Sequence, residues 1–484
     1  MELSLLIVYA VLLSFILGYS FVQLSLVLKY RWARKNRRIE PPMPATWPRV
    51  TIQLPVYNEQ YVIERLIDAT AAIDYPAELL EIQVIDDGND LSVELAAQRI
   101  AYWKSKGVNI VHVRRTDRKG YKAGALAYAL EIAQGEFTAI FDADFIPTPD
   151  FLKRTIPYFS DSKVGMVQTR WEHLNQEYSL LTRLQAFGLD AHFTVEQVGR
   201  NAGNHFMNFN GTGGVWRNAC IRDAGGWQHD TITEDLDLSY RAQLRGWQFI
   251  YLEEVGSPAE LPAEMNALKN QQFRWTKGAA ECAIKNLPTV LRSKNLSSAT
   301  RLHAIFHLLN SSVFLSILGA AVLSIPVLLI KVHGSENPLL FNLAAVFLLG
   351  LLILTFFYWT SHQRSKRSLK TFLIEYPLFL SVSMGLSLHN SIAVIEGLLG
   401  RKTPFVRTPK FAISTQQGTW KDKIYRARKA HPLTLVEVAL GFYFLAGIIY
   451  GIAAGEYGLL PFHAMLTFGF FYVAGQSYIH SRSA

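Results

Sequence analysis

Long uncharged apolar runs constrain this chain more than any other feature of its sequence. Residues 3–28 contain no Asp, Glu, Lys or Arg. Further runs of this kind cover 304–330, 338–360, 458–476 and, with Glu437 as its one acid, 433–454. As a helix, 3–28 would reach about 39 Å, which exceeds a hydrocarbon core of about 30 Å. The sequence therefore predicts an integral, multi-pass membrane protein with about five membrane-spanning helices.

The first run predicts a retained anchor over residues 1–38 and not a cleaved signal peptide. A signal peptide has an apolar core of about 7–15 residues, whereas this run is longer and is followed by a strongly basic stretch at 29–38. Residues 361–370 and 401–432 are also basic, and all three stretches are expected on the cytoplasmic side. They hold more positive charge than the whole chain, whose net charge is +9. The basic balance therefore indicates topology, and nucleic acid is not expected as a partner.

One apolar segment differs from the others because charged and polar residues interrupt it. Residues 371–400 include two acids, Glu375 and Glu396, besides His389 and Asn390. A charge at the bilayer centre costs roughly 2.5–3.5 kcal/mol even on insertion-based scales. Basic loops also flank the segment on both sides. It is therefore predicted to be interfacial or re-entrant.

Residues 39–300 predict a cytoplasmic α/β domain. Strand patterns at 50–54, 81–85, 109–113 and 137–141 alternate with helical patterns at 59–73, 90–105 and 122–134. Such alternation is typical of a mainly parallel sheet that binds ligands at the carboxyl ends of its strands. Polar residues gather at these ends, namely Tyr57, Glu59, Asp87, Asp142 and Asp144. No glycine-rich nucleotide loop follows the first strand, which disfavours Walker-type hydrolysis and dinucleotide binding.

Asp142 and Asp144 flank Ala143 directly after an apolar strand. Two carboxylates at such a point can hold one hard cation that bridges diphosphate oxygens. Taken alone, such a pair is more often two solvated acids in a turn. The stretch Lys119-Gly-Tyr-Lys-Ala-Gly124 opens a helix with positive charge and small residues, and Lys122 is either a phosphate ligand or part of an ordinary basic helix start.

Two further motifs come later in the domain. Thr233-Glu234-Asp235 opens a helix at 234–245, where a carboxylate can act as a general base on a sugar hydroxyl. Acids in a first turn also simply complement the helix dipole. In Gln271-x-x-Arg274-Trp275, the guanidinium can clamp a diphosphate and the indole can stack on a sugar. An interfacial Arg-Trp pair is the structural alternative.

Together and in this order, the motifs at Asp87, Asp142/Asp144, Thr233–Asp235 and Gln271–Trp275 resemble those of the membrane-embedded processive family-2 glycosyltransferases. The residues within these motifs are most similar to those of the cellulose synthase-like A and C branches, which contain glucomannan, mannan and glucan synthases. The resemblance covers about 50–290 and includes Leu54-Pro-Val-Tyr-Asn-Glu59, Gly120-Tyr-Lys-Ala-Gly-Ala-Leu126 and Asn210-Gly-Thr-Gly-Gly-Val-Trp-Arg217.

The resemblance implies a GT-A fold and inverting transfer of glucose or mannose from a nucleotide sugar to a growing β-linked polysaccharide, with translocation of the product. It assigns nucleotide-sugar binding to Tyr57, Glu59, Asp87, Lys122, Asp142, Gln271 and Arg274. It assigns Mg²⁺ or Mn²⁺ to Asp142 and Asp144, and catalysis to Glu234 and Asp235, with Asp235 as the base. It assigns the acceptor to Trp275, Gly211, Thr212 and Gly213.

The C-terminal membrane region, 301–484, also contains a predicted gating loop at 401–412. Phe405-Val406-Arg407-Thr408-Pro409-Lys410 is similar to the family pattern Phe-x-Val-Thr-x-Lys, with Phe405, Thr408 and Lys410 matching. Arg407 stands where the family has Val, so a basic juxtamembrane loop is the alternative.

Other assignments stay open at this level. A non-processive enzyme with a lipid acceptor is the main alternative, and a non-catalytic transporter is a third. The donor is GDP-mannose, GDP-glucose or UDP-glucose, and membrane lipid is an expected partner. The expected location is the plasma membrane in a prokaryote or the Golgi in a plant, and nothing in the sequence indicates an oligomeric state.

Overall fold

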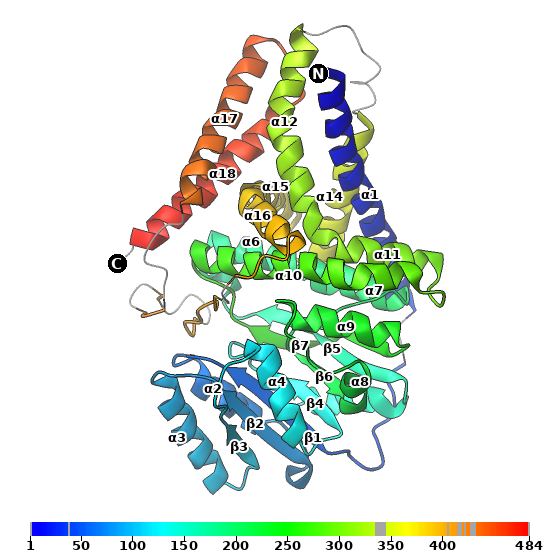
Figure 1. Ribbon diagram of the computed structural model, residues 1–484, viewed down its shortest axis with the longest axis vertical. Helices are drawn as coiled ribbons and strands as arrows, with labels where there is room; N and C mark the ends of the chain where they lie inside the picture. Colours follow the sequence, from blue (N-terminus) through cyan, green and yellow to red (C-terminus); the bar gives the residue numbers. More distant parts are fainter. Residues whose placement is uncertain are drawn as a thin grey trace.

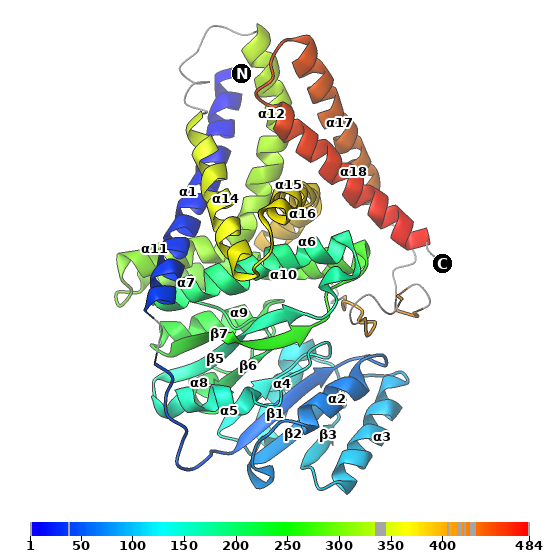
Figure 2. The same cartoon turned by 180° about the vertical axis from the view of Figure 1, so that it is seen from behind.

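The computed structural model describes residues 2–36, 39–333, 345–403, 406–413, 419–420, 423–425 and 432–482. A sheet domain forms one end of the molecule and a helical bundle the other (Figure 1). Several helices lie crosswise between them, and the view from behind shows the same three-tier arrangement (Figure 2).

The sheet has seven strands in the order β3-β2-β1-β4-β6-β5-β7. They are β1 (Val50–Val56), β2 (Leu80–Asp86), β3 (Ile110–Val113), β4 (Phe137–Ile140), β5 (Val164–His173), β6 (Gly214–Arg217) and β7 (Gln248–Ala259). All neighbouring pairs are parallel except the two that β6 makes with β4 and β5. The prediction of a mainly parallel sheet is therefore confirmed, and its first four strands lie where the sequence predicted them.

Helices cover both faces of this sheet, which explains why every residue of β2 is buried. The covering helices are α2 (Ile63–Ala71), α3 (Ser92–Ser105), α4 (Tyr121–Ile132), α5 (Phe151–Thr155), α8 (Asn218–Asp223) and α9 (Glu234–Leu244). Their apolar sides form two hydrophobic clusters with the strands, one around Ile52 and Leu66 and the other around Leu126 and Trp216. Because helices bury both faces of the sheet, the polar residues lie at the ends of the strands.

The middle tier consists of α6 (Leu180–Ala191), a π-helical turn (His192–Glu196), α7 (Gln197–Ala202), α10 (Met265–Arg292) and α11 (Ser298–Leu308). α10 lies between the sheet domain and the bundle in both views (Figures 1 and 2). Because α10 begins soon after β7, it places the Gln271–Trp275 motif above the carboxyl edge of the sheet.

The bundle contains α1 (Glu2–Lys35), α12 (Val313–His333), α14 (Leu348–Arg364), α15 (Leu369–Gly385), α16 (Ser387–Leu398), α17 (Leu433–Ala453) and α18 (Leu460–Arg482). Within the described residues, three helices are long and apolar enough to cross a membrane: Glu2–Lys35, Asn310–His333 and Leu433–Ala453. α15 and α16 are bent by 48° and would make a fourth span if counted as one.

The predicted spans correspond only partly to these helices. The run at 304–330 is divided, because α11 ends at Leu308 and a 3-10 turn at Asn310–Ser312 precedes α12. α14 has 17 described residues, and α18 includes His463, Gln476 and His480. The bend between α15 and α16 falls within the segment predicted to be interfacial or re-entrant. The count of five spans and the domain boundaries stay predictions.

Candidate active site

Two adjoining hollows lie at the carboxyl ends of β1, β2 and β4. The first is lined by Tyr57, Glu59, Asp87, Lys122, Asp142, Asp144, Arg274, Arg407, Thr408 and Lys410, among others. The second is lined by Trp171, Asn210, Gly211, Glu234, Asp235, Gln271 and Trp275. Lys122, Asp142, Asp144, Arg274 and Lys410 border both hollows. Residues predicted from motifs far apart in sequence therefore meet in one continuous site.

The first hollow has a cationic and aromatic wall. The guanidinium of Arg118 lies 3.3 Å from the ring centre of Tyr57. Arg115 binds Asp87 through two hydrogen bonds, one of them 2.9 Å long. Glu59 is buried and pairs with Arg407, with Oε2 2.7 Å from Nη1. Burial raises the pKa of Glu59 to about 7, while Arg407 and Lys410 act to lower it.

The Asp142/Asp144 pair lies between the hollows. Lys122 Nζ donates to Asp142 Oδ1 at 2.5 Å and to the Gly211 carbonyl at 2.9 Å. Lys410 Nζ lies 2.5 Å from Asp144 Oδ2. Asp144 Oδ1 is buried and has no hydrogen-bond partner among the described residues.

This oxygen set fits a hard divalent cation. Within the described chain, no three His, Cys, Asp or Glu side chains converge on one point. Two carboxylates, one of which has an unpartnered buried oxygen, are what an Mg²⁺-type site needs when substrate phosphates supply further ligands.

The carboxylates at the start of α9 face Lys122 across the second hollow. Glu234 and Asp235 form the first turn of that helix, and burial raises the pKa of each above its usual value. The charge of Lys122 opposes this shift in both groups. A carboxylate with a raised pKa is a stronger base near neutral pH, as general-base catalysis requires.

Gly211 lines the second hollow where the backbone passes close to Asp235 and Lys122. Its φ is +80°, and a Cβ there would lie 3.1 Å from Asp235 Oδ2 and 3.4 Å from Lys122 Nζ. Thr212 and Gly213, which follow Gly211, do not line either hollow. Thr212 Oγ1 accepts a hydrogen bond from the Asp142 amide at 2.9 Å, so Thr212 supports the acidic pair.

α10 contributes the remaining predicted residues. Arg274 donates to the Val406 carbonyl at 2.5 Å and to Thr408 Oγ1 at 2.8 Å. Burial lowers the pKa of Arg274 to about 10. Trp275 lies 6.4 Å from Trp171, measured between ring centres, and the two indoles border the second hollow.

The predicted gating loop contacts the site through its described part. Thr408 binds Arg274, and Lys410 pairs with Asp144. Phe405, the third predicted gating residue, lies outside the described residues. Arg407, which departs from the family pattern, pairs with Glu59 and lies 4.4 Å from the ring centre of Tyr425. Whether this segment gates the site stays a prediction.

Sequence reasoning missed several lining residues. Arg118 precedes the Lys122 motif by only four positions, and this proximity was the available signal. Trp171 lies near the end of β5, a strand that the sequence analysis did not predict. Asn210, by contrast, is the first residue of the motif predicted to line the acceptor side, and it borders the second hollow.

The sheet, with its acidic pair after β4 and the two carboxylates in the first turn of α9, defines a glycosyltransferase of the GT-A fold. A family model described as "Glycosyltransferase like family 2" matches residues 48–278. Over 463 residues the chain is 34% identical to glucomannan 4-beta-mannosyltransferase 7 of Arabidopsis thaliana, covering 92% of this chain and 79% of that protein. It is 35% identical to glucomannan 4-beta-mannosyltransferase 1 of Cyamopsis tetragonoloba, covering 91% and 84%. The chain belongs to the glucomannan 4-beta-mannosyltransferase family.

Two further similarities concern parts of relatives or the fold alone. The probable glucomannan 4-beta-mannosyltransferase 4 of Oryza sativa subsp. japonica is 43% identical, over 54% of this chain and 49% of that protein. Among solved structures, the mannosyltransferase PcManGT from Pyrobaculum calidifontis, in complex with GDP-Man and Mn²⁺, matches with a TM-score of 0.55 and 19% identity. The match covers 81% of this chain and all of that one, and supports the GT-A fold.

Proposed function

We propose that this protein transfers mannose from GDP-mannose to the end of a growing β-linked polysaccharide, with inversion at the sugar carbon. The observation that carries the proposal is the meeting of the two hollows at Lys122, Asp142, Asp144 and Arg274. A nucleotide sugar in the first hollow would place its diphosphate at these charges. The names of the relatives indicate mannose as the sugar.

The residues present divide the chemistry between the two hollows. Asp235 removes the proton of the acceptor hydroxyl, and its raised pKa suits this role. Lys122 and Arg274 stabilise the charge that develops on the departing diphosphate. Asp142 and Asp144 would hold Mg²⁺ or Mn²⁺, which neutralises diphosphate charge when bound. Trp275 packs against the acceptor sugar and orients its hydroxyl.

A direct displacement of this kind needs one base and no nucleophilic carboxylate, because no glycosyl-enzyme intermediate forms. The acceptor hydroxyl attacks the sugar carbon as the bond to the diphosphate oxygen breaks. The proton moves to Asp235 and the electron pair leaves with the nucleoside diphosphate. Burial of Glu234 beside Asp235 favours its protonated form, which limits charge repulsion there.

We also propose that the product leaves through the bundle. A third cavity adjoins the second hollow and shares Gln271, Trp275 and Leu189 with it. Its wall comes from α6, α10, α12, α15 and α16, with residues Leu184, Gly188, Phe314, Phe379, Val382 and Leu386 among its lining. This continuity favours an extending polymer over a single addition to a lipid. The catalytic domain is then on the cytoplasmic side of the membrane.

The test is a panel of labelled GDP-mannose, GDP-glucose and UDP-glucose incubated with membranes from cells that express the protein. We expect GDP-mannose to give a polymer that an endo-β-mannanase degrades. A discrete lipid-soluble glycoside would support the lipid-acceptor alternative and contradict the polymerase assignment. Transfer from UDP-glucose alone would contradict the assignment of mannose.

Asp235→Asn tests the base. We expect transfer to fall about 100-fold or more while GDP binding persists, because a positioned base contributes 10²–10⁴-fold. Glu234→Gln is the matched comparison, one position earlier in the same turn, and should retain more activity. If Glu234→Gln proves the more damaging change, the base is Glu234.

A further inference from the structure

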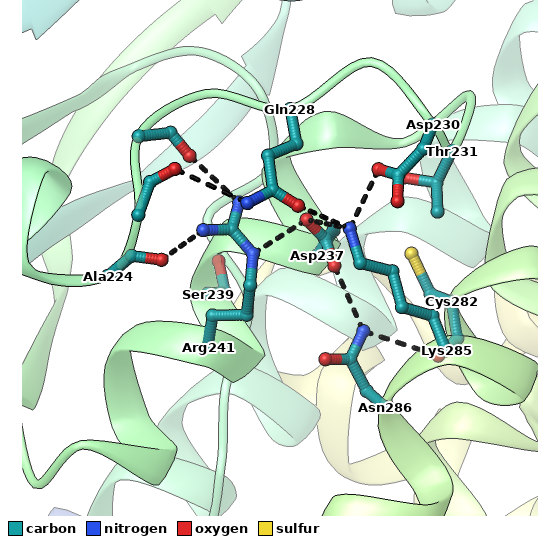
Figure 3. A network of polar contacts seen from close by, with 12 residues as sticks. Ala224, Gln228, Asp230, Thr231, Asp237, Ser239, Arg241, Cys282, Lys285 and Asn286 are labelled. Carbon is teal, nitrogen blue, oxygen red and sulfur yellow. Dashed lines mark hydrogen bonds and ion pairs between the residues drawn. The ribbon is translucent and has the colours of Figure 1, made fainter.

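Asp237, two positions after the proposed base, is the centre of a polar network that faces neither hollow. Its side chain is fully buried. Asp237 Oδ2 accepts from Arg241 Nε at 2.8 Å and lies 3.0 Å from Lys285 Nζ, while Oδ1 accepts from Asn286 Nδ2 at 3.1 Å (Figure 3). Arg241 lies on α9, whereas Lys285 and Asn286 lie on α10. One carboxylate therefore joins the two helices that supply the second hollow.

The same cations bind the loop that leads into α9. Lys285 Nζ also donates to Asp230 Oδ1 and to Gln228 Oε1, each at 2.7 Å. Arg241 donates to the carbonyls of Ala224 and, at 2.9 Å, Gly226. Figure 3 shows both cations reaching from opposite sides to Asp237. The loop and the first turn of α9 are thus both connected, through Arg241 and Lys285, to the carboxylate of Asp237.

α10 also contacts the end of this loop directly. The amide of Ile232 donates to Glu281 Oε2 at 2.7 Å. A Cβ on Gly278 would lie 2.4 Å from Thr233 Cγ2, so the backbone of α10 and Thr233 are in close contact. About one turn before Gly278, the same helix carries Arg274 and Trp275 toward the hollows.

We propose that Asp237 is a positioning residue, which sets Asp235 on α9 against Arg274 and Trp275 on α10. The inference rests on the proposed function for the roles of those three residues. A buried carboxylate between two cations is costly to neutralise, because the cations lose a partner that holds them in place. If Asp237 loses its charge, Lys285 still binds Asp230 and Gln228 but no longer fixes α10 to α9.

Asp237→Asn keeps the size of the side chain and removes its charge. We expect kcat to fall about 10- to 100-fold, since misplacement by about 1 Å has such an effect. KM for the donor and GDP affinity should change less than about threefold, because Tyr57, Glu59 and Asp87 follow β1 and β2 on the other side of the site. A general loss of folding would lower GDP affinity as well.

Two further variants separate positioning from stability. Asp223→Asn is the matched control, because Asp223 pairs with Arg245 at the other end of α9 (3.2 Å), and it should leave kcat unchanged. Lys285→Met should reproduce most of the loss, and Lys285→Arg should recover it. The double variant Asp237→Asn/Lys285→Met should be no worse than Asp237→Asn alone.

Hydrogen exchange supplies a readout that does not depend on transfer. In Asp237→Asn we expect faster exchange in the first turn of α9, with α4 unchanged. An unchanged kcat, an additive double variant or unchanged exchange in α9 would overturn the proposal. If the wild-type protein transfers no sugar from any donor, the proposed function fails, and the exchange result still decides whether Asp237 holds this turn.

Discussion

Gly211 illustrates how a single residue can limit the approach of substrate and base. Its φ of +80° favours glycine, and the space for a Cβ is bordered by Asp235 Oδ2 at 3.1 Å. We expect Gly211→Ala to reduce transfer by about tenfold or more, because the methyl group would displace Asp235, the proposed base, or Lys122. Initial rates with saturating donor measure the effect. Gly107→Ala is the control, since Gly107 has a φ of +86° with nothing within 4 Å. Equal losses in the two variants would contradict the steric argument.

Glu59 gives the site a predictable pH dependence. Burial raises its pKa to about 7, so the folded protein keeps this proton between pH 4.5 and 7 while the unfolded chain releases it. Its contribution to stability is therefore greatest at low pH and declines as the pH rises toward 7, by on the order of 1–3 kcal/mol.

Glu59→Gln removes this titration. We expect the melting temperature of the wild type, relative to Glu59→Gln, to decline from pH 5 to pH 7.5 and then to level off. Thermal unfolding of the purified protein in detergent measures it, with Glu78→Gln as an exposed control. A difference that grows with pH would show that Arg407, and not burial, determines the ionisation of Glu59.

At the scale of elements, a buried ion pair joins α10 to α17. Lys269 Nζ lies 2.8 Å from both carboxylate oxygens of Glu437, and neither side chain is appreciably exposed. Removing one partner should destabilise the protein by about 3–5 kcal/mol, because the other charge stays buried and unpaired. We expect Lys269→Met to lower the melting temperature and Lys269→Met/Glu437→Met to recover much of it. A double variant that is less stable than either single variant would contradict this account.

The same pair shows why elements were easier to predict than their contacts. Strand and helix patterns are local, and four strands with their intervening helices were predicted to within a few residues. Glu437 was recognisable as the single acid of an apolar run, but its partner lies 168 positions away. No local pattern identifies such a partner.

In the candidate site, too, the positions of the motifs were predictable from local patterns, whereas their long-range contacts were not. Each acidic motif stands at a strand or helix end, where sequence patterns are informative, and the fold brings those ends to one edge. The contacts from Arg407 to Glu59 and from Lys410 to Asp144 join positions more than 200 residues apart. The sequence predicted that the gating loop at 401–412 lies near the site, but only the fold shows which carboxylates it contacts.

At the scale of the whole molecule, basic residues join the sheet domain to the bundle. Arg34 at the end of α1 lies 2.9 Å from Glu254, and Arg364 at the end of α14 lies 3.1 Å from Glu253. Both acids belong to β7. Residues from two of the stretches that predict a cytoplasmic location thus also hold the sheet domain against α1 and α14, which predicts that the domain lies on the same side of the membrane as those stretches.

The topology that this docking predicts can be measured with single cysteines. Cys220 and Cys282 are buried, so an introduced surface cysteine should be the reactive one. Ala101 lies exposed on α3 of the sheet domain, and Gly458 lies exposed in the turn between α17 and α18 at the opposite end of the molecule (Figure 1).

In sealed inverted vesicles, an impermeant maleimide should label Ala101→Cys, and should label Gly458→Cys only after detergent is added. In intact cells, the maleimide should label Gly458→Cys, and should label Ala101→Cys only after the membrane is permeabilised. Labelling of both variants from one side would contradict the placement of the sheet domain and the α17–α18 turn on opposite faces of the membrane.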